Sequence, residues 1–180
     1  LAVGGSEAYM YGNMEGTALE EMFPVTFSLS ESAEGNSVAL MLVLDCSSSM
    51  SNRAAYLSVA KQGAIKCVEA MSDRDYAGVV SFNTKAYLNS KLIPTTPANK
   101  ERLNLVISSL STWSGTYYTE ALKMAHQQLL QSDADVKHII FLSDGQPSDY
   151  DYPEAAAAIA ADGISLSTIG LISGCSSFLG

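Results

Sequence analysis

The chain has 180 residues, of which 47% are hydrophobic and 16% are charged. This composition fits one compact domain and excludes disordered and collagen-like proteins. Nineteen acidic residues against ten basic ones give a net charge of −9, which argues against a nucleic-acid partner, because such binding requires a basic surface. The longest apolar run, residues 38–44, is too short to cross a bilayer, which takes about 20 residues, so we expect no direct membrane insertion of this segment.

Residues 1–35 are rich in glycine, glutamate, serine and methionine and show no sustained periodicity, apart from 24–29, which alternate like a strand. We expect a partly ordered leader over 1–35, followed by a domain over 36–180. The chain does not begin with Met, and residues 1–20 lack the pattern of a signal peptide. We therefore expect it to be a piece of a longer protein.

Residues 38–44 are apolar on both faces, which is typical of a central parallel strand. A helix should follow, because apolar residues recur at helical spacing: Leu57, Ala60, Ala64, Cys67, Val68 and Met71. Residues 76–82 and 86–92 both favour strands, and the connection between them is short enough for an antiparallel hairpin.

Thr96-Pro97 has the pattern of an N-cap with proline at the first helical position, and it predicts the start of a second helix. A third helix is marked by apolar positions at Ala121, Leu122, Ala125, Leu129 and Leu130. Residues 139–142 form a short buried strand in this interpretation. A helix over 155–161 then ends at Gly163, and a last strand covers 164–169.

This order predicts an α/β fold: a doubly wound, mostly parallel sheet of order 3-2-1-4-5 with helices on both faces. The strand over 86–92 should be an antiparallel edge. The strand over 164–169 should be the other edge, and exposed edges pair with further chains, so an edge-strand dimer is possible. Ligands of such sheets bind at the carboxyl ends of the strands.

Three polar motifs occupy those strand ends: Asp-Cys-Ser-Ser-Ser at 45–49, Ser-Gly-Thr at 114–116 and Ser-Asp-Gly at 143–145. Together they offer two carboxylates and three hydroxyls, from Asp45, Ser47, Ser49, Thr116 and Asp144. These are hard oxygen donors, which suit Mg²⁺ or Mn²⁺. Because hydroxyls are neutral donors, the ion would stay electron-poor and would accept a carboxylate from a partner protein.

Each motif also has a purely structural interpretation. The serines of 45–49 could form a turn with local hydrogen bonds, Thr116 could be the N-cap of the third helix, and Asp144 could belong to an ordinary turn.

With these motifs the chain resembles a von Willebrand factor A domain with a metal-ion-dependent adhesion site. The resemblance covers residues 36–172 and includes Asp-x-Ser-x-Ser-Met at 45–50 and Ala-Leu six residues after the Gly-Thr pair. It implies that Ser47, Ser49 and Thr116 coordinate the ion, with Asp45 and Asp144 often acting through water. It also implies a non-enzymatic, divalent-cation-dependent adhesion or scaffold module.

Three residues depart from the family pattern. Glycine is usual at the position of Ser48 and frequent at that of Ser114, and threonine is common at that of Ser143. None of these differences removes a donor oxygen. The resemblance implies a further helix and edge strand after 169, so we expect the domain to be truncated at its C-terminus. Residues 16–25 resemble the segment that precedes the A domain in bacterial membrane proteins with a glutamine-amidotransferase-like region. We therefore expect a membrane-anchored parent protein with this domain on the extracytoplasmic side.

Two alternatives stay open. A haloacid-dehalogenase-type phosphatase would use Asp45 as nucleophile, with Asp144 and Asp149 holding Mg²⁺. Ser47 argues against it, because it stands where that family needs a second acid. The other alternative is a structural A domain with a vestigial metal site.

The remaining candidates have structural explanations that compete with functional ones. Trp113, Tyr117 and Tyr118 could form an aromatic rim for a partner, or Trp113 could pack under its loop. We expect packing or surface roles for His126 and His138, and solvated positions for Asp149 and Asp151. Structural roles also suffice for the three cysteines, Cys46, Cys67 and Cys175.

Overall fold

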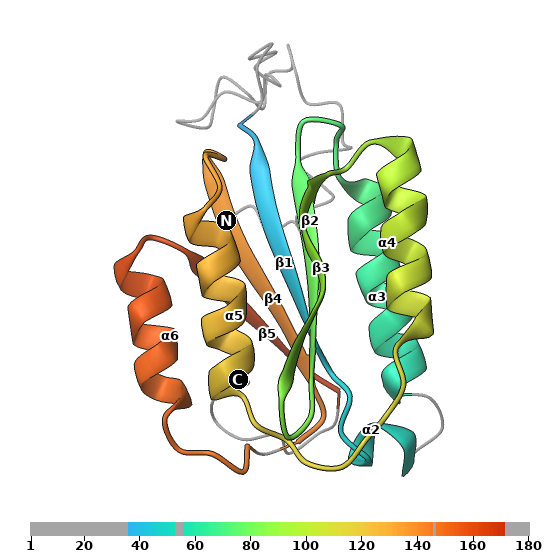
Figure 1. Cartoon of the computed structure of the whole chain (residues 1–180), viewed down its shortest axis with the longest axis vertical. Helices are drawn as coiled ribbons and strands as arrows, with labels where there is room; N and C mark the ends of the chain where they lie inside the picture. The colour runs from blue at the N-terminus through green and yellow to red at the C-terminus, as the bar shows by residue number, and fades with distance from the viewer. Residues whose placement is uncertain (1–35, 53–55, 146, 172–180) are drawn as a thin grey trace, which may run out of the picture. The chain divides into compact units, whose positions relative to one another are not determined.

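The computed structural model describes residues 36–52, 56–145 and 147–171, so the predicted leader over 1–35 lies outside the described residues. The described part forms a five-stranded sheet covered by helices on both faces (Figure 1). Its elements are, in chain order, β1 (Val38–Asp45), α2 (Ser49–Asn52), α3 (Tyr56–Ala70), β2 (Tyr76–Phe82), β3 (Ala86–Pro94), α4 (Pro97–Ser109), α5 (Thr119–Leu130), β4 (Val136–Ser143), α6 (Tyr152–Ala161) and β5 (Ser165–Gly170).

The strand order is β3-β2-β1-β4-β5, which confirms the predicted topology. β1 pairs in parallel with β2 and β4, and β4 pairs in parallel with β5. β3 runs antiparallel to β2 as the predicted edge strand, because the connection over 83–85 is too short for a crossover. α3 and α4 cover one face of the sheet, and α5 and α6 cover the other (Figure 1).

β1 lies at the centre of the sheet, and its side chains enter both cores alternately. Met41 and Val43 pack with the core that α5 and α6 close, whereas Leu42 and Leu44 pack with the core that α3 and α4 close. All four side chains are fully buried. A strand that is apolar on both faces therefore takes the middle position, as the sequence predicts.

Several element boundaries differ from the prediction: β3 extends to Pro94, β5 covers Ser165–Gly170, and the starts of β4 and α6 move furthest. β4 begins at Val136 and not at residue 139, because Lys137 and His138 continue the pairing with β1 although they are polar. α6 begins at Tyr152, ahead of the alanine run that predicted it.

The predicted helix ends are confirmed in part. Gly163 follows α6 with φ +71° and donates its N–H to the Ala160 carbonyl, and Ile164 donates to the Ile159 carbonyl, which is a Schellman ending. Thr96 is the N-cap residue of α4 and Pro97 opens the helix, as predicted, although the Thr96 side chain makes no capping hydrogen bond.

None of the described helices is long and apolar enough to span a membrane. The expectation of a missing C-terminal helix and strand concerns the chain beyond Leu171, which lies outside the described residues.

Candidate metal centre

The carboxyl ends of β1, β2 and β4 meet at one end of the sheet, where α2 follows β1 (the lower end in Figure 1). We call this end of the sheet the carboxyl edge. Asp45 ends β1, and Ser143 ends β4 on the neighbouring strand. The motifs over 45–49 and 143–145 are thereby brought together, because parallel strands present their carboxyl ends on the same side.

Four of the five predicted ligands lie in one hydrogen-bonded group. The hydroxyls of Ser47 and Ser49 are 2.9 Å apart, and Ser49 Oγ donates to Asp144 Oδ1 at 2.8 Å. The Ser47 backbone N–H donates to Asp45 Oδ1 at 2.7 Å. Two carboxylates and two hydroxyls therefore converge from two neighbouring strand ends.

Thr116, the fifth predicted ligand, is half-buried and lies outside this hydrogen-bonded group. Its loop is nevertheless held at the same edge, because Trp113 donates its backbone N–H to the Cys46 carbonyl at 2.7 Å. Farther along the loop, Tyr117 donates its N–H to the Asn83 carbonyl at 2.8 Å. These bonds connect both ends of the Thr116 segment to the ends of β1 and β2.

Gly115 makes this close approach possible. Its φ of +89° is a left-handed conformation, and a Cβ at this position would lie 2.1 Å from Thr84 Cγ2. A side chain at residue 115 would therefore push the Thr116 loop away from the β2–β3 turn.

In the part of the chain that the structure describes, the two carboxylates are buried without a positive partner. Asp45 is 0% exposed and Asp144 is 3% exposed. In the described part of the chain no lysine or arginine pairs with either, since the ion pairs there join Lys123 to Glu120 and His126 to Asp162. Two buried carboxylates destabilise each other and the fold unless a positive charge is supplied.

The pKa of Asp45 reflects this environment. Burial raises it most, hydrogen bonds from Ser143 and Ser47 lower it, and the charge of Asp144 raises it again, so that the pKa lies above its usual 3.8. A cation bound at this edge would act in the opposite direction and favour the ionised carboxylate.

Among the described residues, no three histidine, cysteine, aspartate or glutamate side chains are grouped to hold a metal ion. A cation at this edge would therefore need the hydroxyls of Ser47, Ser49 or Thr116 beside the two carboxylates. That donor set is entirely oxygen, which fits Mg²⁺ or Mn²⁺ and not a soft metal.

Sequence reasoning named Ser143 and Tyr118 but missed that they support Asp45. Ser143 Oγ donates to Asp45 Oδ2 at 2.5 Å, and the Tyr118 hydroxyl lies 2.8 Å from Ser143 Oγ. The same hydroxyl donates to the Gly145 carbonyl at 2.7 Å. Tyr118 is fully buried, so its assignment to an exposed aromatic rim is wrong.

Asp149 is also placed differently from the prediction. Its carboxylate accepts the backbone N–H groups of Tyr118 and Thr119 at 3.0 and 2.7 Å, so it satisfies the start of α5. It is therefore not a solvated loop acid, whereas Asp151 is exposed as expected. Because α5 begins at Thr119, the interpretation of Thr116 as its N-cap is wrong as well.

The exposure of the other aromatic candidates and the positions of the two histidines test their predicted roles. Trp113 is 67% exposed, so it does not pack under its loop, and Tyr117 is 42% exposed beside it. His126 lies on α5 with its Nε2 2.8 Å from an Asp162 oxygen. His138 lies in the amino-terminal half of β4, away from the carboxyl edge.

Solved structures resemble this fold at low sequence identity. BatB from Bacteroides thetaiotaomicron has a TM-score of 0.65 and 24% identity, over 74% of this chain and 66% of that chain. An aerotolerance-related membrane protein from Bacteroides fragilis has a TM-score of 0.65 and 22% identity, over 74% and 67%. The vWF domain of the type V pili tip protein Mfa5 from Porphyromonas gingivalis has a TM-score of 0.59 and 23% identity, over 78% and 43%.

This chain thus spans about two thirds of the BatB structure and less than half of the Mfa5 structure. A search of curated protein sequences gave no significant match. The sequence model of the von Willebrand factor type A domain matches residues 39–177, which is most of the chain and includes all three motifs. The chain therefore belongs to the von Willebrand factor type A domain family.

Proposed function

We propose that this domain is a protein-binding module that depends on a divalent cation, Mg²⁺ or Mn²⁺, held at the carboxyl edge of the sheet. The observation that carries the proposal is the pair of buried carboxylates, Asp45 and Asp144, which lie beneath two hydroxyls and have no positive partner among the described residues. A divalent cation would supply the missing charge.

The residues divide into three roles in this proposal. Ser47, Ser49 and Thr116 would hold the ion, and Asp45 and Asp144 would balance its charge. A bound ion supplies a positive charge that attracts an acidic side chain of the partner. Ser143 fixes the orientation of Asp45 by donating to Oδ2, so that the carboxylate is positioned before any ion arrives.

The relatives support an interaction role and a membrane-linked parent. One is a domain of a pilus tip protein. The Bacteroides fragilis relative is described as a membrane protein. We infer that the present domain belongs to a membrane-anchored parent on the extracytoplasmic side and binds a protein there.

The structure of the site argues against the phosphatase alternative. A nucleophilic Asp45 would need an exposed oxygen, but the residue is 0% exposed and both its oxygens accept hydrogen bonds. Asp149, the second metal ligand of that alternative, is bound to the start of α5. We expect no Mg²⁺-dependent turnover of a generic aryl phosphate.

Calorimetric titration of MgCl₂ and MnCl₂ into the protein tests the proposal. Wild type should bind one ion, and S49A and D144N should lose the heat of binding while keeping a cooperative thermal transition. D73N, an exposed acid in the turn before β2, is the matched control and should bind like wild type. At 100 times the dissociation constant, the ion should stabilise the fold by about 2.7 kcal/mol.

A wild type that shows neither heat nor a melting shift with millimolar Mg²⁺ or Mn²⁺ would favour the structural domain with a vestigial site. If the proposal holds, pull-down of a partner from the native membrane fraction should succeed with Mg²⁺ and fail with chelator.

A further inference from the structure

A hollow of about 370 Å³ lies beside the candidate cation site. Cys46 and Leu110 contribute buried apolar surface to it, and Tyr87 and Trp113 contribute exposed rings. Serine and asparagine side chains supply the rest of the described lining, which contains no charged residue. In a chain with a net charge of −9, an uncharged hollow is a distinct environment.

The hollow and the cation site share one piece of backbone. Cys46 stands between Asp45 and Ser47, so its neighbours on both sides belong to the cation site. Trp113 donates its N–H to the Cys46 carbonyl and forms an isolated parallel bridge with Ser47. A partner segment whose carboxylate reaches the cation would therefore place an adjacent residue over the hollow.

The lining limits what that adjacent side chain can be. The described lining offers a charged group no direct ion pair to offset its lost hydration, so a neutral side chain fits better. Trp113 is 67% exposed and Tyr87 is 47% exposed, and such rings gain most from contact with another aromatic ring.

Asn83, which lines the hollow, carries a hydrogen-bond donor without a partner among the described residues. Asn83 is 5% exposed, and its Oδ1 accepts from the Lys85 N–H at 3.0 Å. Its Nδ2 donates no hydrogen bond to any described residue. A phenolic oxygen that reached this donor would add a hydrogen bond, so we expect tyrosine to bind more tightly than phenylalanine.

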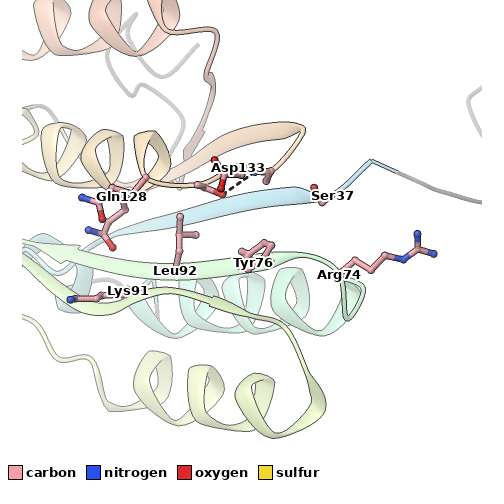
Figure 2. Close-up of a pocket in the computed structure, with 10 residues that line it drawn as sticks. Ser37, Arg74, Tyr76, Lys91, Leu92, Gln128 and Asp133 are labelled. Carbon is pink, nitrogen blue, oxygen red and sulfur yellow. Dashed lines mark hydrogen bonds between the residues drawn. The ribbon is translucent and has the colours of Figure 1, made fainter.

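A second hollow of about 390 Å³ provides no comparable site. It lies at the amino-terminal end of β1, where Ser37 lines it, far along the strands from Asp45. In Figure 2 the long side chains of Arg74 and Lys91 extend in opposite directions, so they do not converge on one ligand.

We propose that the hollow between Cys46, Asn83 and Trp113 is a specificity pocket for an aromatic side chain of the partner, one or two positions along the chain from the acidic residue that the cation binds. This inference rests on the proposed function. It narrows the ligand class to a segment with a carboxylate and an aromatic residue, best tyrosine, one or two positions apart.

A panel of fluorescein-labelled peptides tests the proposal by anisotropy at saturating Mg²⁺. Each peptide has one glutamate in a glycine-serine background. Tyrosine or alanine is placed at one position, either one or two residues before the glutamate or one or two residues after it. We expect tyrosine at one position to tighten binding about tenfold over alanine. W113A and Y87A should remove that gain in affinity without changing the affinity for Mg²⁺. L105A is the control: it removes an exposed apolar side chain of α4 outside the hollow, and it should leave the gain from tyrosine intact.

Trp113 supplies a second readout, because it is the only tryptophan of the chain. With an unlabelled version of the panel, its emission should shift with the tyrosine peptide and stay unchanged with the alanine peptide.

Mg²⁺-dependent peptide binding with equal affinity for tyrosine and alanine at every position would overturn the pocket and leave the cation site standing. The absence of any heat with Mg²⁺ would overturn both proposals.

Discussion

At the scale of single residues, the Tyr118 side chain connects the candidate cation site to the hydrophobic core. It donates to the Gly145 carbonyl and lies beside Ser143, while its ring packs on Phe82 and Phe141 with centroids 5.5 and 4.7 Å away. Y118F should keep the ring contacts and lose the hydrogen bond to the Gly145 carbonyl, at a cost of about 1–2 kcal/mol in the free energy of unfolding. Denaturant titration measures this cost.

Y150F is the matched control for this prediction, because Tyr150 is 89% exposed. It should unfold like wild type. Equal stability of Y118F and Y150F would show that the Tyr118 hydroxyl contributes nothing to the fold.

The carboxylate pair makes a prediction about the metal-free domain. The pKa of Asp45 is raised by burial and by Asp144, so ionisation of Asp45 destabilises the folded state as pH rises from its usual 3.8 through the folded value. D144N removes the neighbouring charge and keeps an oxygen for Ser49. Without metal at pH 7, D144N should therefore melt above wild type, and with saturating Mg²⁺ this order should reverse.

Thermal melts in chelator and in Mg²⁺ check this reversal. A D144N domain that melts below wild type in both buffers would mean that Asp144 stabilises the fold through its own hydrogen bonds.

At the scale of elements, Asp75 joins β1 to the turn that follows α3. Its carboxylate accepts the Val38 N–H at 2.9 Å and both the N–H and the hydroxyl of Ser72 at 2.6 and 2.9 Å. Burial pushes the pKa of Asp75 upward, but these bonds and the charge of Lys100 outweigh it, so the pKa lies below its usual 3.8.

The contribution of Asp75 to stability should therefore be complete above about pH 4 and be lost as pH falls through the folded pKa. D75N should cost about 2 kcal/mol at pH 7, because the amide nitrogen cannot accept from Ser72. Denaturant unfolding across pH should show the two proteins converging in acid. D73N in the same turn should follow wild type throughout, and a gap between D75N and wild type that is independent of pH would contradict the assignment.

β5 is the edge of the described sheet opposite β3, and it pairs only with β4 among the described residues. Unpaired edges attract other strands, so we expect a concentration-dependent dimer formed through β5. Ile169 is 43% exposed on this strand, and I169K should shift the equilibrium to monomer, because charge on an edge strand opposes pairing. Sedimentation equilibrium measures the mass, and a monomer at every concentration would refute the dimer.

At the scale of the whole molecule, the net charge of −9 acts against an acidic ligand. At saturating Mg²⁺, raising NaCl from about 10 to about 150 mM shortens the Debye length from about 30 to about 8 Å and screens this repulsion. The association rate of the glutamate peptides should therefore rise with salt, which stopped-flow anisotropy measures. A rate that falls with salt would indicate a positively charged docking surface instead.

The strand order was predictable from sequence because few arrangements satisfy the apolar pattern. A strand that is apolar on both faces must be central, and a three-residue connection over 83–85 forces a hairpin. The start of β4 was not predictable, because Lys137 and His138 join the sheet through backbone pairing, which their polar side chains do not reveal.

At the candidate site, the motifs marked the strand ends correctly. They did not show which distant residues form the supporting hydrogen bonds. Tyr118 and Ser143 are 25 positions apart, and Asp149 reaches α5 from 30 positions beyond Thr119. Only the packed fold shows such pairs. The exposure of Trp113 was not predictable for the same reason, because it depends on how the loop that carries Trp113 attaches to Cys46.

The thiol of Cys46 lies inside the loop that carries the candidate cation ligands, and burial together with the charge of Asp45 raises its pKa to about 12. Oxidants and alkylating reagents attack an accessible thiolate, whereas this thiol is 3% exposed and its raised pKa favours the protonated form. The loop should therefore be insensitive to oxidising and reducing conditions, although it carries a cysteine between two candidate cation ligands.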